Sequence, residues 1–110
     1  MKIVFHIDEN SKWQTALSNV ANALSYAKQK QLTISIVVVV NGSAITEYLA
    51  NDVQVFISTH QGTVEFHACQ NAMASHHISA EQLPKTVKVV PAGVIDLVTL
   101  QDQGFRYIKP

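Results

Sequence analysis

The sequence predicts an α/β fold with a mostly parallel, five-stranded sheet, and three features of the chain indicate it. Short apolar runs rich in β-branched residues alternate with segments whose apolar residues recur every three or four positions. The strand-like runs are apolar at nearly every position, which is typical of strands covered on both faces. Turn-forming Gly, Asn, Asp and Pro residues separate most of these segments. We therefore expect a single layered domain over residues 1–110.

The first predicted strand is Lys2 to Ile7, an apolar run interrupted only by His6. Asp8-Glu9-Asn10 ends this strand with turn-forming residues. A helix is expected to follow, because Ser11 and Gln14 have the spacing of a capping box. Its apolar stripe consists of residues at steps of three and four, namely Trp13, Ala16, Leu17, Val20, Ala23, Leu24 and Ala27.

The second strand is expected at Leu32 to Val40, the most β-branched run of the chain. Asn41-Gly42 stops it. A short helix is predicted over Ser43–Ala50, and a longer one follows from Asn51 to His60. Gly62 is well placed as the left-handed residue that closes the longer helix.

Three more strands are predicted in the second half of the chain, at Thr63–Ala68, Val87–Val90 and Phe105–Lys109. A short helix from Asn71 towards Ser75 follows Cys69. Ser79 and Gln82 have the spacing of a second capping box. The last helix begins after Gly93 and is closed by Gly104, with an apolar pattern at Val94, Leu97 and Val98.

The composition restricts the environment of the protein. The chain is 47% hydrophobic and 15% charged, so much of its apolar surface must be covered by its own helices or by another subunit. A formal net charge of zero leaves no electrostatic basis for binding nucleic acid or an anionic membrane. The apolar runs are too short to span a bilayer, and the polar residues after Ile7 are not typical of a signal peptide. We expect a cytoplasmic protein.

A candidate functional site is expected where the carboxyl ends of the strands meet, because ligands of parallel α/β sheets bind outside that edge. The only cysteine, Cys69, lies there between a strand and a helix. Backbone N–H groups at the start of a helix stabilise a thiolate, the nucleophilic form of cysteine. His67 lies two positions before Cys69 and so shares its face of the strand. The candidate catalytic residue is Cys69, and the candidate binding residues are Asp8, Asn41, Gly42, His67, Asn71 and Gly93.

Each of these residues also has a purely structural interpretation, which the sequence leaves open. Asn41-Gly42 is a good turn wherever a strand meets a helix, and Asp8 is a suitable helix cap. His6 and His67 fit a core or an interface when a ring nitrogen is hydrogen-bonded. Cys69 is then a small buried hydrophobic residue.

A metal site is a further alternative, since imidazole and thiolate both bind transition metals. The candidate ligands are His60, His67, Cys69, His76 and His77. Their irregular spacing matches no zinc pattern, so we predict neither a metal nor another cofactor. The chain also lacks the glycine-rich motifs of nucleotide sites and the nucleophile elbow of serine hydrolases.

Five segments carry a resemblance to a known family, and they are Lys2–Glu9, Val40–Gly42, Val64–Asn71, Val90–Val94 and Gln101–Pro110. In order and spacing they resemble the DsrE/DsrF-like family, in particular its small stand-alone branch. The resemblance extends over nearly the whole chain. It implies a Rossmann-like, three-layer α/β/α domain and a homo-oligomer, often a trimer or a hexamer made from trimers.

The same resemblance implies a chemistry. In the sulfur-relay members of the family, a cysteine at this strand end carries sulfane sulfur as a persulfide and passes it between proteins. Cys69 matches that position, and Asn41, Gly42 and Gly93 match the turns around the family's pocket. The hypothesis is therefore a sulfur carrier that works with donor and acceptor proteins. The alternative is an oligomeric module that binds a small ligand or a partner, in which Cys69 is only a packing residue.

The sequence also suggests where subunits meet. The helix residues Val53 to Ile57 and the C-terminal run Phe105–Ile108 have less obvious cover within the chain than the first two strands. We expect these apolar surfaces to be buried against a second copy.

Overall fold

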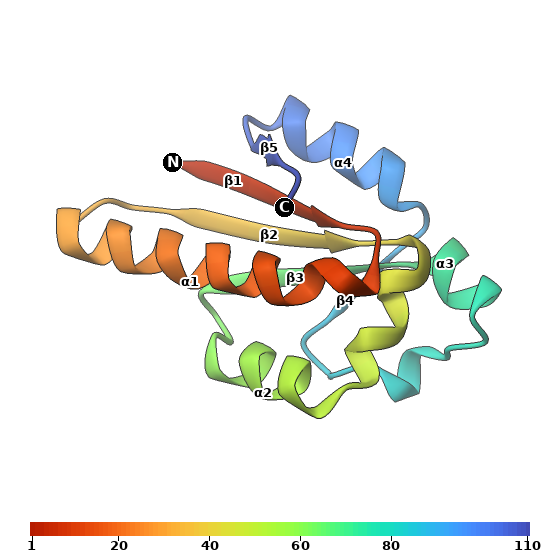
Figure 1. Ribbon diagram of the computed structural model, residues 1–110. Coiled ribbons are helices and arrows are strands. Elements are labelled where there is room, and N and C mark those ends of the chain that lie inside the picture. Colours follow the sequence, from red (N-terminus) through yellow and green to blue (C-terminus); the bar gives the residue numbers. More distant parts are fainter.

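Five parallel strands form one sheet in the order β4-β3-β2-β1-β5 (Figure 1). The computed structural model describes all residues from 1 to 110. The strands are β1 (Lys2–Ile7), β2 (Ser35–Val40), β3 (Val64–Cys69), β4 (Lys88–Val90) and β5 (Arg106–Ile108). The predicted α/β class and the five-stranded parallel sheet are confirmed.

Helices cover both faces of this sheet. The α-helices are α1 (Trp13–Lys30), α2 (Asn51–Thr59), α3 (Gln70–Ser75) and α4 (Gly93–Asp102). Short 3-10 helices occupy Asn10–Lys12, Gly42–Leu49 and Ala80–Gln82. Figure 1 shows α1 and α2 on one side of the sheet and α4 on the other, which gives three layers. None of the helices combines the length and the apolar character that a membrane crossing requires.

The larger core lies between the sheet and the layer that contains α1 and α2. It contains 22 buried residues, and alternate positions of β1, β2 and β3 contribute to it. Two buried polar side chains in this layer have partners. The Trp13 indole N–H donates to the Ala44 carbonyl at 2.9 Å, and the Tyr48 hydroxyl donates to the His67 carbonyl at 2.7 Å. Burial raises the pKa of Tyr48 well above its usual value, so the hydroxyl remains a donor.

The smaller core lies under α4 and contains Val4, Val37, Val39, Leu97 and Leu100. The outer face of α4 is also apolar, since Val94, Ile95 and Val98 are 61%, 64% and 55% exposed. The predicted helix is therefore present, but Val94 and Val98 point outward and only Leu97 of the predicted apolar pattern is buried. A helix that is apolar on all sides is typical of one buried on all sides.

Two sequence-based expectations are wrong. Val53 and Ile57 do not lack cover, because they pack into the larger core with 1% and 3% exposure. The residues from Asn10 to Lys12 form a 3-10 turn, and no side chain caps α1, so the Ser11 capping box does not form. By contrast, Gly62 and Gly104 have the expected positive φ angles, 85° and 94°.

Candidate functional site

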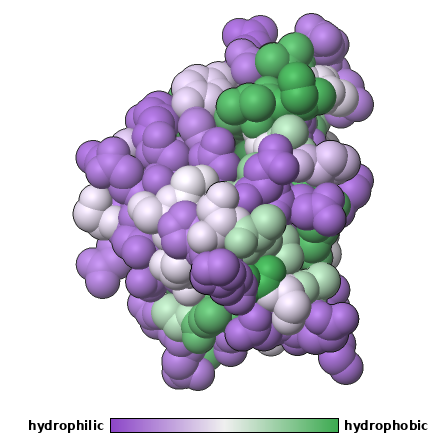
Figure 2. All heavy atoms as spheres, turned by 90° about the vertical axis from the view of Figure 1, so that its right-hand side faces the viewer, coloured by the Kyte–Doolittle hydropathy of each residue, from purple (hydrophilic) through white to green (hydrophobic).

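An open pocket of about 300 Å³ lies at the carboxyl edge of the sheet, beyond the ends of β2 and β3. Figure 2 views the molecule from this side. Five of the seven predicted site residues line the pocket, namely Asn41, Gly42, Cys69, Asn71 and Gly93. The parallel register brings them together, because it aligns Val40 at the end of β2 with Ala68 near the end of β3.

Cys69 is the last residue of β3 and the N-cap of α3. Its backbone is extended, and the side chain is free and only 6% exposed. The first residue of α4, Gly93, lies beside it, so the amino-terminal ends of two helices border the pocket. The unpaired N–H groups and the dipoles at such ends favour negative charge. The site is therefore suited to an anion.

The two glycines of the pocket are required by its geometry. A Cβ atom at Gly93 would lie 3.2 Å from the Cβ of Asn41 and 3.3 Å from the Cβ of Cys69. The absent side chain allows Asn41 and Cys69 to face each other across this position. Gly42 has a φ of +58°, and a Cβ there would lie 2.8 Å from the carbonyl oxygen of Asp8.

Asn41 belongs to a hydrogen-bonded chain that the sequence did not predict. His6 Nε2 lies 2.8 Å from Asn41 Oδ1, and His6 Nδ1 lies 2.6 Å from the Tyr107 hydroxyl. His6 and Tyr107 are 101 positions apart, and the pairing of β5 with β1 brings them together. This contact depends on strand order, for which the local sequence has no signal.

His76 also lines the pocket, although the sequence pointed to it only as a candidate metal ligand. Its Nδ1 lies 3.0 Å from the Ala72 carbonyl, which can only accept. Nδ1 therefore carries a proton, and in the neutral ring Nε2 is left as an acceptor. No group of three or more His, Cys, Asp or Glu side chains is placed to hold a metal ion.

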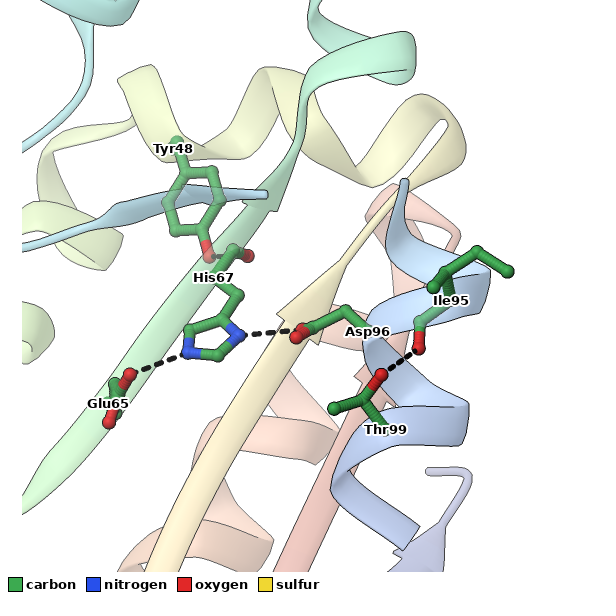
Figure 3. A network of polar contacts seen from close by, with 6 residues as sticks. All are labelled: Tyr48, Glu65, His67, Ile95, Asp96 and Thr99. Carbon is green, nitrogen blue, oxygen red and sulfur yellow. Dashed lines mark hydrogen bonds and ion pairs between the residues drawn. The ribbon is translucent and has the colours of Figure 1, made fainter. Parts of the chain in front are cut away.

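Two of the predicted site residues lie outside the pocket. Asp8 forms an ion pair with Lys109 at 2.6 Å, and this hydrogen bond holds the pKa of Asp8 below its usual value. His67 faces α4 and is 3% exposed. Its Nδ1 lies 2.6 Å from Asp96 Oδ2 and its Nε2 lies 2.7 Å from Glu65 Oε1 (Figure 3). His67 thus joins the sheet to α4.

A larger pocket of about 470 Å³ lies near the opposite ends of β2 and β3. Its lining includes Glu65 and Phe105 but no histidine or cysteine. The Glu65 carboxylate already accepts from His67. The smaller pocket is the better candidate, because it contains the thiol, an amide and an imidazole.

The comparisons agree with this architecture. A solved structure described as a protein of unknown function, MTH1491, from Methanobacterium thermoautotrophicum has 28% sequence identity to this chain and a TM-score of 0.87. The alignment covers 99% of this chain and 98% of that one. No curated protein matches the chain significantly. The DsrE/DsrF-like family model matches residues 1–110. The chain therefore belongs to the DsrE/DsrF-like family, which is generally linked to sulfur relay.

Proposed function

We propose that this protein carries sulfane sulfur as a persulfide on Cys69 and transfers it from a donor protein to an acceptor protein in the cytoplasm. The observation that carries the proposal is the position of Cys69. The only thiol of the chain lies in an open pocket, between the amino-terminal ends of α3 and α4. Membership of a family linked to sulfur relay supports the same chemistry.

The transfer needs no cofactor. The Cys69 thiolate attacks the outer sulfur of a donor persulfide, R–S–SH, forming a new S–S bond while the donor S–S bond breaks. The electron pair of the broken bond leaves with the donor as R–S⁻, and Cys69 becomes Cys69–S–SH. An acceptor thiolate then attacks the outer sulfur and releases the Cys69 thiolate. Each step is nucleophilic displacement at sulfur, so no outside oxidant or reductant is consumed.

A second candidate function is binding without chemistry. The observation that favours it is the 6% exposure of Cys69, since structural cysteines are buried and inert. In that case the pocket holds a small ligand or a segment of a partner protein, and the thiol contributes only packing.

The labelling rate of Cys69 by iodoacetamide at about pH 7 separates the two functions. For a carrier we expect rapid labelling of the native protein, because transfer needs an accessible thiolate. The helix ends at the pocket favour the reactive anion. Slow labelling that becomes fast only in denaturant identifies a packing residue and contradicts the carrier function.

We also propose that the protein is a homo-oligomer, a trimer or a hexamer, that buries the outer face of α4 against a second copy. Figure 2 shows hydrophobic side chains gathered at the top of the molecule, where Figure 1 places α4. Val94, Ile95 and Val98 are each more than half exposed there. A second copy fits this surface because the chain has no net charge to oppose self-association.

Light scattering at micromolar concentration tests the assembly. The wild type should be an oligomer, and Ile95→Asp should shift it towards the monomer, because the new carboxylate would be buried without a partner. Val55→Asp is the matched control, since Val55 is 56% exposed on α2. A monomeric wild type, or equal effects of the two substitutions, contradicts an interface at α4.

A further inference from the structure

The side chain of Asn41 has a hydrogen-bond donor without a partner in the protein. Its Oδ1 contacts His6 Nε2, and its Nδ2 contacts no acceptor. Every fully buried side-chain nitrogen and oxygen in the protein has a hydrogen-bond partner, so the unpartnered Nδ2 is not fully buried. Asn41 is half-buried and lines the pocket, so this N–H group is accessible there. Nδ2 lies 3.4 Å from the point where a Gly93 Cβ would be, and the Cβ of Cys69 lies 3.3 Å from that point. A free amide donor therefore borders the space beside the thiol.

Two residues outside the pocket determine which way this amide is turned. The Oδ1 of Asn41 can only accept, so His6 Nε2 carries a proton and donates to it at 2.8 Å. In the neutral imidazole Nδ1 is then an acceptor, and the Tyr107 hydroxyl donates to it at 2.6 Å. With Oδ1 held by His6, Nδ2 is left to face the pocket.

We propose that Asn41 donates a hydrogen bond to the anionic sulfur on Cys69, and that His6 and Tyr107 are positioning residues that hold its amide in the donating orientation. The inference rests on the proposed sulfur-carrier function and deepens it, because it names the side chain that stabilises the negative charge on the Cys69 sulfur. Both the thiolate and the persulfide anion carry negative charge in this pocket. A hydrogen-bond donor that already points at the sulfur stabilises this charge, and the side chain does not have to reorient when the charge forms.

The variant Asn41→Asp tests the donor. It keeps the size of the side chain and an acceptor for His6, but it replaces the N–H bonds by a negative charge. Iodoacetamide labelling of Cys69 at pH 7 should become at least about tenfold slower, since hydrogen bonds to charged groups are strong. Asn22→Asp, at an exposed position of α1, is the matched control and should label like the wild type.

Substitutions of His6 distinguish positioning from packing. His6→Gln retains a side-chain N–H for Asn41 Oδ1, whereas His6→Phe retains a ring without a donor. A positioning role predicts that the Gln variant labels faster than the Phe variant, and a packing role predicts the reverse. Tyr107→Phe should slow labelling in the same way, whereas Tyr26→Phe on the exposed face of α1 should not.

Two results would overturn the proposal: wild-type labelling of Asn41→Asp, or wild-type labelling of His6→Phe in a protein with a native circular dichroism spectrum. Sulfur uptake from polysulfide, measured on the same proteins, tests the carrier function separately. A wild type that takes up no sulfur refutes the carrier function, while the labelling rates still decide the roles of Asn41, His6 and Tyr107.

Discussion

Replacing His67 by leucine is expected to lower the free energy of unfolding by about 3–5 kcal/mol, the usual cost of breaking a buried ion pair from one side. The ring of His67 lies between two carboxylates, with Nδ1 2.6 Å from Asp96 and Nε2 2.7 Å from Glu65 (Figure 3). An ionised carboxylate only accepts hydrogen bonds, so both contacts are satisfied when both ring nitrogens donate.

The two carboxylates differ in what the substitution does to them. The Asp96 side chain is 14% exposed and would be left buried without a partner. The Glu65 side chain is 54% exposed and can turn into water. The loss of stability therefore comes mainly from the unpaired Asp96 carboxylate, and it weakens the packing of α4 against the sheet.

Urea denaturation at a fixed protein concentration, followed by the fluorescence of the single tryptophan Trp13, measures this loss. His77→Leu in the exposed loop is the matched control and should change stability by less than 1 kcal/mol. The double variant with both His67→Leu and Asp96→Leu should recover most of the loss, because no charge remains buried. A small effect of His67→Leu, or no recovery in the double variant, would contradict a stabilising contact between the His67 ring and Asp96.

Much of the fold was predictable because it depends on local patterns. The run Ile36–Val40 is β-branched and apolar throughout, as expected for a strand with helices on both faces. The stripe that begins at Trp13 predicted which face of α1 is buried. The pocket was predictable for a related reason, since the carboxyl ends of parallel strands meet at one edge and Cys69 ends β3.

The remaining features depend on contacts between distant segments. Nothing near His67 in the sequence indicates that its ring contacts Asp96 on α4 instead of lining the pocket. Likewise, the partnership of His6 with Tyr107 follows from the position of β5 beside β1. The inner face of α4 could not be predicted from periodicity, because apolar residues lie on both its buried and its exposed sides.

The second large effect concerns Cys69 itself. Cys69→Ser should abolish sulfur uptake completely, because the chain has no other thiol and a hydroxyl does not form a persulfide. The fold and the assembly should persist, since serine has nearly the same shape and the site opens to the pocket. Loss of the oligomer in this variant would instead identify Cys69 as a packing residue.

Intact-protein mass spectrometry after incubation with polysulfide tests the carrier function most directly. The wild type should gain the mass of one or more sulfur atoms, a thiol reductant should remove that mass, and Cys69→Ser should gain none. A folded wild-type protein that gains no sulfur, or an equal gain in Cys69→Ser, would contradict the persulfide on Cys69.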